Sequence, residues 1–223
     1  TGSISPYAVI KKLNEMIDED ATVTVDVGAI TCWFFQMFER RRHTVFSNGG
    51  FAPISYAIGA SIGVAATDSA RQVIMVIGDG GLQNNIQELQ TIAENEFNIQ
   101  IIVLNNYGYG IVKQFQDLYM DGRHEASGRG YSVPDLEKIA NGYGIDYVRI
   151  DDLKSFSEDL VANVGPQIID VTLHPNTMIE PKLELGRPIN DQYPYVSDNE
   201  FEVANKFVSF ERPGWMVDRI IME

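Results

Sequence analysis

Residues 73–112 constrain the fold of this chain more than any other stretch. Val73 to Ile77 is a short, wholly apolar and mostly β-branched run, which is typical of a strand buried in a parallel sheet. The run ends at Gly78-Asp79-Gly80-Gly81, so a strand delivers an aspartate to a glycine-rich turn. A second apolar run, Ile99 to Leu104, ends at Asn105-Asn106. Two buried strands that each end in polar residues are therefore expected here.

The segment between these runs predicts a helix. Its apolar residues recur at helical spacing, and Asn85 and Glu88 are placed to form a capping box at its start. Strand, helix and strand make a βαβ unit, and its right-handed crossover brings both strand ends to one edge of the sheet. We therefore expect Asp79 and Asn106 to lie side by side.

A carboxylate and an amide oxygen beside a glycine-rich turn suit a magnesium diphosphate. The hard cation prefers oxygen ligands in an octahedron and takes few of them from protein, which leaves positions for phosphate oxygens. The backbone N–H groups of Gly80 and Gly81 can approach a phosphate because no Cβ blocks them. A single Gly-Asp-Gly is weak evidence, since strand-end aspartates are common in α/β proteins, but the pair of strand ends strengthens the prediction.

This arrangement resembles the signature of thiamine diphosphate (ThDP) enzymes, in particular the acetolactate synthase branch. The matching features are GDG, the following NIQEL, a second apolar strand and NN, and the resemblance covers Ile4 to about Thr172. It implies that Asp79 and Asn106 are the side-chain ligands of Mg²⁺ and that Gly108 supplies its backbone carbonyl. It also implies that the Gly80-Gly81 turn contacts the diphosphate, although the family often has Ser at the position of Gly81.

The resemblance implies further contacts with the cofactor. In the family, the Asp-Val-Gly of the first loop is often followed by Gln-His-Gln, where this chain has Ala29-Ile30-Thr31, so only backbone contacts at Gly28 and Ala29 remain as candidates. The carbonyl of Ala52 would meet the aminopyrimidine 4′-amino group. The N–H of Ile54 would meet the adjacent ring nitrogen, and its side chain would sit beneath the bent cofactor. The full set of predicted cofactor-binding residues is Gly28, Ala29, Ala52, Ile54, Gly78, Asp79, Gly80, Gly81, Asn106, Gly108, Tyr109, Gly110 and Ile111.

Two positions match family residues near the substrate. Ile111 stands where Met is frequent, and Phe115 stands where a Trp is associated with the choice of the second 2-keto acid. Both residues fit equally well as core residues. Phe in place of Trp keeps an aromatic wall but enlarges the pocket, so this position does not decide which acceptor substrate is used.

Composition excludes several functional classes. The 223 residues suit one domain with a substantial core. A net charge of −14 argues against nucleic acid or an anionic membrane as a partner, and we interpret the basic cluster Arg40 to His43 as a helix C-terminal cap. The sequence has no apolar run long enough for a membrane span and no signal peptide, so we expect a cytoplasmic protein. The single cysteine, Cys32, is interpreted as a small buried hydrophobe and not as a reactive thiol.

The pattern along the chain predicts an α/β fold. Strands near residues 23, 45, 75, 102, 147 and 169 predict a six-stranded, mostly parallel, doubly wound sheet with helices on both faces. Residues 1–173 form the expected diphosphate-binding domain. We expect 174–223 to be an irregular C-terminal extension, rich in aromatic residues, that packs on the domain or on a neighbouring subunit. Residues 121–130 are expected to be a mobile surface loop in which His124 is solvated.

The resemblance implies half of an active site. ThDP enzymes need a glutamate that activates the cofactor, and it belongs to a pyrimidine-binding domain that this sequence lacks; the catalytic residues are therefore unknown. The leading hypothesis is the ThDP- and Mg²⁺-binding part of a 2-keto acid carboligase or decarboxylase (a lyase or transferase) of the acetolactate synthase type. We expect it to be inactive alone and to work in a homo- or hetero-oligomer. The alternatives are a subunit of a simple 2-keto acid decarboxylase, a non-catalytic module that binds ThDP or a nucleotide, and a receiver-like domain phosphorylated at Asp79.

Overall fold

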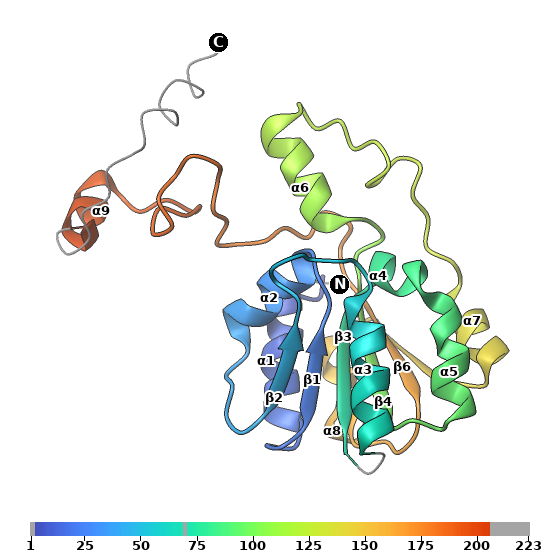
Figure 1. Cartoon of the computed structure of the whole chain (residues 1–223). Helices are drawn as coiled ribbons and strands as arrows, with labels where there is room; N and C mark the ends of the chain where they lie inside the picture. Colours follow the sequence, from blue (N-terminus) through green and yellow to red (C-terminus); the bar gives the residue numbers. More distant parts are fainter. Residues whose placement is uncertain (1–2, 69–70, 206–223) are drawn as a thin grey trace. The chain divides into compact units, whose positions relative to one another are not determined.

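A computed structural model describes residues 3–68 and 71–205 (Figure 1). The chain divides into two compact units, Thr1–Met178 and Ile179–Glu223. The first unit continues past residue 173 because the indole N–H of Trp33 donates to the carbonyl of Met178, at 3.1 Å. Each unit is described separately below.

The first unit contains a six-stranded sheet in which all the strand pairings are parallel. The spatial order is β2-β1-β3-β4-β6-β5. Because β2 lies on one side of β1 and β3 on the other, the direction of winding reverses between β1 and β3, and such a switch point leaves a crevice at the carboxyl ends of the strands. The strands are β1 (Thr22–Val25), β2 (Thr44–Ser47), β3 (Val73–Gly78), β4 (Ile99–Asn105), β5 (Asp146–Ile150) and β6 (Gln167–Thr172).

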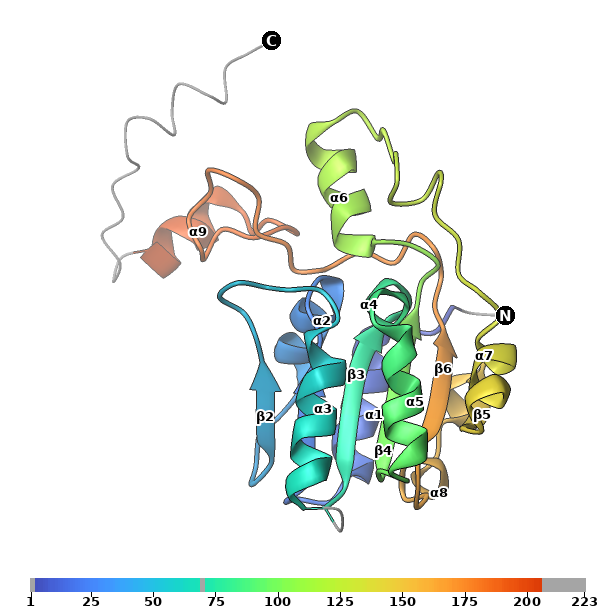
Figure 2. The same cartoon turned by 45° about the vertical axis from the view of Figure 1, so that its right-hand side comes forward.

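Helices cover both faces of this sheet, as Figures 1 and 2 show. Alternate residues of β3 (Val73, Met75 and Ile77) join buried residues of α3, α5 and α7 in one core layer. On the other face, α1 packs against α2, and Trp33 and Phe34 of α2 are fully buried. The helices of this unit are α1 (Pro6–Met16), α2 (Ala29–Met37), α3 (Tyr56–Thr67), α4 (Asp79–Asn84), α5 (Leu89–Glu94), α6 (Gly110–Tyr119), α7 (Leu136–Tyr143) and α8 (Glu158–Val161), with 3₁₀ turns at Ile86–Glu88 and Leu153–Ser155.

The predicted α/β fold class and all six strands are confirmed, and the sheet is fully parallel. The predicted start of the helix after the glycine turn is wrong. Helix α4 begins directly at Asp79, and Asn85 makes no side-chain cap but separates α4 from the next turn. The Asn84 amide instead donates to the carbonyl of Gly80, at 2.7 Å, which ties the end of this short helix to its first turn. The aspartate therefore stands at a helix start, not in a loop.

The second unit is mostly irregular in its described part, residues 179–205. Lys182 and Tyr193 exchange two backbone hydrogen bonds of 2.8 and 2.9 Å. Arg187 pairs with Asp191 at 2.6 Å, and its guanidinium lies 3.9 Å from the centre of the Tyr195 ring. Helix α9 (Asp198–Asn205) follows. Phe207, Phe210 and Trp215, three of the apolar residues from which the packing of the extension is predicted, lie outside the described residues.

In residues 3–68 and 71–205 we find no helix that is both long enough and apolar enough to cross a membrane.

Candidate functional site

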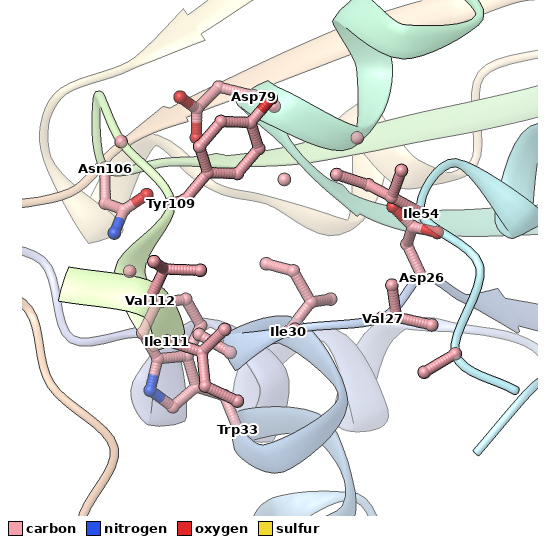
Figure 3. A pocket seen from close by; sticks show the side chains of 18 residues that line it. Asp26, Val27, Ile30, Trp33, Ile54, Asp79, Asn106, Tyr109, Ile111 and Val112 are labelled. Carbon is pink, nitrogen blue, oxygen red and sulfur yellow. The ribbon is translucent and has the colours of Figure 1, made fainter. Parts of the chain in front are cut away.

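A pocket with a cavity volume of about 340 Å³ opens where β1, β3 and β4 end. In Figure 3, Asp79 and Asn106 lie toward one side of this pocket, and Asp26 and Ile54 lie toward the other. All thirteen residues predicted to bind the cofactor line it: Gly28, Ala29, Ala52, Ile54, Gly78, Asp79, Gly80, Gly81, Asn106, Gly108, Tyr109, Gly110 and Ile111. Five further residues complete the lining, namely Asp26, Val27, Ile30, Trp33 and Val112.

Asp79 and Asn106 meet as the βαβ argument predicts. One atom of the Asn106 amide lies 3.2 Å from Asp79 Oδ1 and 2.8 Å from the carbonyl oxygen of Gly108. With its nitrogen in that position, the amide donates hydrogen bonds to both oxygens. With its oxygen there, Asn106, Asp79 and Gly108 present three neighbouring oxygens. Adjacent ligands of an octahedral Mg²⁺ are about 2.8–3.0 Å apart, given metal–oxygen distances of about 2.0–2.1 Å. The two separations from the Asn106 atom are close to that spacing, so the three groups could serve as ligands of one cation.

The Asp79 carboxylate is buried, with 1% of the residue exposed. Tyr131 donates a hydrogen bond of 2.7 Å to Asp79 Oδ2, and Gln83 donates to the Tyr131 hydroxyl at 2.8 Å. Burial raises the pKa of Asp79 to about 6, and the hydrogen bond from Tyr131 opposes that rise. Burial and the nearby Asp79 raise the pKa of Tyr131, so its hydroxyl keeps its proton and acts as the donor. Sequence reasoning missed Tyr131, because no pattern links two residues 52 positions apart.

Both glycines after Asp79 have no room for a side chain. A Cβ on Gly80 would collide with the ring of Tyr109, and a Cβ on Gly81 would collide with Asp26 Oδ2. Asp26 is itself 1% exposed and accepts hydrogen bonds from the backbone N–H groups of Ser55, at 3.2 Å, and Ala57, at 3.4 Å. Burial raises the pKa of Asp26, and these backbone hydrogen bonds oppose the rise. Asp26 therefore fixes the start of α3 beside the glycine turn.

The same contacts hold the segment that carries Ala52 and Ile54. Ala52 and Ser55 adopt positive φ angles of 47° and 70°, which non-glycine residues adopt only where the surroundings require it. The aspartate of the first loop was noted in the sequence only as part of Asp-Val-Gly, and its anchoring of Ser55 was not foreseen. The signal that could have indicated this role is a lone acidic residue directly after a buried strand.

The first loop gives the pocket an apolar wall. Gly28 has a φ of 89°, which permits the sharp turn into α2, and the side chain of Ile30 packs within 3.5 Å of the position that a Cβ on Gly78 would occupy. Figure 3 shows Ile30, Ile111 and Trp33 gathered along one side. Among the residues that the structure describes, no Lys, Arg or His lines this pocket. Within the described part of this chain, backbone N–H groups and a bound metal ion are therefore what could balance the charge of a diphosphate.

Only one of the two residues predicted to lie near the substrate lines the pocket. Ile111 lines the pocket, whereas Phe115 does not; it lies one turn further along α6, is 39% exposed and packs on Tyr119. The segment 121–130, predicted as a surface loop, is in contact with the site, because Ser127 is fully buried and its carbonyl accepts the N–H of Tyr109 at 3.0 Å. In the same segment, His124 is not simply solvated as predicted, since it pairs with Asp117 at 2.5 Å.

A buried polar network supports the end of β4. The Asn105 amide donates to Asp170 of β6 at 3.1 Å, while its oxygen accepts the N–H of Tyr107 at 3.2 Å. Tyr147 of β5 donates to the other oxygen of Asp170 at 2.9 Å. Tyr107 has a positive φ of 55°, and the Asn105 contact holds the backbone in that turn. The first asparagine of the Asn-Asn pair thus fixes the turn, while the second enters the pocket.

Comparison with known proteins now identifies the class of this site. Residues 26–171 match the family model described as "Thiamine pyrophosphate enzyme, C-terminal TPP binding domain", TPP being another name for ThDP. The match spans more than half of the chain and every residue of the pocket. The chain therefore belongs to the thiamine diphosphate enzymes and corresponds to their C-terminal cofactor-binding domain.

Acetolactate synthase large subunits are among the proteins to which the chain is similar. The chain is 31% identical over 185 residues to the acetolactate synthase large subunit of Cyanidium caldarium, covering 82% of this chain and 32% of that protein. It is 28% identical over 187 residues to the acetolactate synthase large subunit of Lactococcus lactis, covering 82% of this chain and 32% of that protein. The chain thus spans about a third of the length of these relatives.

Proposed function

We propose that this chain is the diphosphate- and Mg²⁺-binding half of a ThDP-dependent 2-keto acid carboligase or decarboxylase of the acetolactate synthase type. The observation that carries the proposal is the convergence of Asp79 Oδ1, the Asn106 amide and the Gly108 carbonyl at the mouth of the pocket. These three groups would hold the metal ion, and the metal ion would hold the diphosphate. A separate pyrimidine-binding domain or subunit would complete the active site.

The bound cofactor would supply the reactive carbon that takes up a 2-keto acid and releases carbon dioxide. The residues of this chain would bind and orient it. The backbone groups of the Gly80-Gly81 turn would face the diphosphate, and Ala52 and Ile54 would meet the pyrimidine ring. Ile30 and Ile111 would exclude water from the apolar side of the pocket. Among the described lining residues, the acidic side chains are Asp26, which accepts hydrogen bonds from the backbone N–H groups of Ser55 and Ala57, and Asp79, which we assign to the metal. We therefore expect the chain to need its partner domain for turnover.

Calorimetric titration of ThDP and MgCl₂ into the chain, alone and together with a pyrimidine-binding domain, tests this proposal. We expect binding that tightens when the partner domain is present, because the two domains would share one cofactor. Turnover of a 2-keto acid should then require both parts. Failure to bind under both conditions would reject the assignment in favour of a non-catalytic domain.

A second candidate is a simple decarboxylase that releases an aldehyde. It is favoured by the apolar first loop, in which Ala29-Ile30-Thr31 stands where the family often has Gln-His-Gln, and by the position of Phe115 outside the pocket. Both features remove contacts that could select a second keto acid. Product analysis of the assembled enzyme decides between the two, since a carboligase yields an acyloin-type product and a decarboxylase yields the aldehyde.

A further inference from the structure

The segment between α6 and α7, residues 120–135 (the α6–α7 loop), runs from the end of α6 to α7 beside β5 in Figures 1 and 2. Two of its residues contact the groups that carry two of the three oxygens that would hold the metal, without touching those oxygens themselves. Tyr131 bonds to the side chain of Asp79, and Ser127 bonds to the peptide that follows Gly108. Neither residue lines the pocket, so each would act through the group it touches.

Tyr131 gives the two oxygens of the Asp79 carboxylate different partners. Its hydroxyl donates to Oδ2 at 2.7 Å, while Oδ1 faces the Asn106 amide at 3.2 Å. The Tyr131 hydroxyl in turn accepts a hydrogen bond from Gln83 at 2.8 Å, so its own proton is left to point at Asp79. The ring also packs on Tyr109, with 4.8 Å between the ring centres. The carboxylate therefore cannot rotate without breaking a buried hydrogen bond.

Ser127 fixes the second oxygen through the peptide bond. The carbonyl of Gly108 and the N–H of Tyr109 belong to the same trans peptide and point in opposite directions. Because that N–H donates to the Ser127 carbonyl at 3.0 Å, the Gly108 carbonyl is turned toward the Asn106 amide, 2.8 Å away. The Ser127 hydroxyl donates to the side chain of Gln116 on α6 and holds the loop in place. A Cβ on Gly108 would come within 2.7 Å of the Ser127 carbonyl, which shows how closely the two segments pack.

We propose that Tyr131 is a positioning residue for the metal ion, acting through Asp79, and that the α6–α7 loop aligns two of the three metal-binding oxygens. This inference rests on the proposed function of the site. Partners of metal ligands of this kind set ligand orientation, and their loss lowers metal affinity by about 10–100-fold. The effect of Tyr131 should therefore be on the metal requirement and not on the contacts that the protein makes with ThDP itself.

The test uses Mn²⁺ as the probe, because free Mn²⁺ can be counted by electron paramagnetic resonance without any turnover. The chain assembled with its pyrimidine-binding domain is titrated with MnCl₂ at saturating ThDP, as wild type and as Tyr131→Phe. We expect the half-saturating Mn²⁺ concentration to rise at least about 10-fold in the variant. At saturating Mn²⁺, the half-saturating ThDP concentration should stay within about twofold of wild type, since the positioning loss is overcome by mass action.

Tyr7→Phe is the matched control. Tyr7 also donates a hydrogen bond to a side chain, to Gln36 Oε1 at 3.0 Å, but neither residue lines the pocket. Its loss should leave the Mn²⁺ requirement unchanged. Gln83→Leu, which removes the bond that orients the Tyr131 hydroxyl, should raise the requirement in the same direction by a smaller factor. This variant keeps the test decisive if Tyr131→Phe does not fold.

Three outcomes overturn the inference. Equal Mn²⁺ requirements in wild type, Tyr131→Phe and Gln83→Leu would show that the loop does not position the metal, while leaving the proposed function intact. An equal rise in Tyr131→Phe and Tyr7→Phe would show a general effect of removing a tyrosine hydroxyl and not a positioning of the metal. Absence of ThDP-dependent Mn²⁺ binding in the wild type would reject the proposed function itself, and the inference with it.

Discussion

At the scale of single residues, Asp79 is the central residue of the proposed metal site. Its two carboxylate oxygens have different surroundings, since one accepts from Tyr131 and the other faces Asn106 and Gly108. Burying a carboxylate is unfavourable, and its raised pKa of about 6 reflects that cost in the protein without metal. A bound cation would supply the compensating charge. The residue is therefore better suited to binding a metal than to stabilising the fold.

Asp79→Ala should abolish magnesium-dependent ThDP binding while leaving the domain folded, and Asn106→Ala should weaken that binding. Loss of the Tyr131 hydrogen bond in Asp79→Ala is offset by removal of a desolvated charge, so the free energy of unfolding should change by no more than about 1 kcal/mol. Calorimetry gives the affinities, and urea unfolding gives the stability. Unchanged ThDP affinity in both variants would contradict the assignment of the metal ligands.

Gly81→Ser should destabilise the domain by about 1–3 kcal/mol, although Ser is frequent at this position in the family. The new Cβ would meet Asp26 Oδ2 and would lie 3.0 Å from Ile77 Cγ1. Asp26 cannot turn away without leaving the N–H groups of Ser55 and Ala57. The control is Gly49→Ser, where no heavy atom lies within 4 Å of the added Cβ. Urea unfolding should separate the two variants, and equal stability would show that Asp26 has room to move.

At the scale of elements, the strands were predicted well and the helices less well. Val73 to Ile77 is wholly apolar and Ile99 to Leu104 is apolar except for Gln100, so both runs predict central parallel strands from local sequence. The break after α4 could not be predicted in this way. It depends on the Asn84 amide returning to Gly80 and on Tyr109 packing over the same turn, and both contacts are set by the tertiary structure.

For the candidate site, the sequence likewise predicted the residues that line the pocket but not the contacts that support them. Every predicted cofactor-binding residue lines one pocket, because those residues stand at strand ends and a parallel sheet gathers strand ends at one edge. Their roles in binding remain predictions. The supporting contacts of Tyr131, Ser127 and Asp26 were missed, since each joins segments far apart in the sequence and leaves no periodic signal.

Tyr147→Phe in β5 should destabilise the domain in a pH-dependent way. Burial raises the folded-state pKa of Asp170, so its contribution to stability is fully present below the unfolded value near 3.8 and is lost as the pH rises through the folded value. Tyr147 lowers that folded pKa by donating to the carboxylate. Removal of the Tyr147 hydroxyl should therefore raise the folded-state pKa of Asp170 further. The destabilisation of the variant relative to wild type should then grow from pH 4 to pH 8, toward about 1–3 kcal/mol.

Urea unfolding of wild type and Tyr147→Phe across this pH range measures the difference. The comparison isolates the pair, because all other carboxylates titrate in both proteins. A destabilisation that is constant with pH, or that shrinks as the pH rises, would contradict the assignment of Asp170 as the affected group.

At the scale of the whole molecule, charge decides how the cofactor can bind. The chain has a net charge of −14, and in its described part no Lys, Arg or His lines the pocket. An anionic diphosphate would therefore be repelled by the net charge of this chain and attracted, within its described pocket, by a bound metal and by backbone N–H groups. We infer that ThDP cannot bind appreciably without a divalent cation.

Removal of the metal should accordingly remove the stabilisation that ThDP provides. With MgCl₂ and ThDP at about 100 times its dissociation constant, the assembled protein should gain about 2.7 kcal/mol against unfolding. Addition of EDTA should return the unfolding midpoint to that of the protein without cofactor. The measurement is thermal unfolding with ThDP alone, MgCl₂ alone, both together, and both with EDTA. Persistent stabilisation by ThDP in EDTA would show that a cation is not required.

The register between β3 and β4 has a consequence for the choice of ion. Gly78 is paired with Leu104, and the proposed ligand residues Asp79 and Asn106 follow one and two positions after that pair. The spacing of these two backbone positions is thus set by the hydrogen-bonded ladder of the central sheet. A coordination shell built on such a fixed spacing would select metal ions by their radius. It would accept ions of the radius of Mg²⁺ or Mn²⁺ and exclude Ca²⁺, whose bonds to oxygen are longer, at about 2.3–2.6 Å.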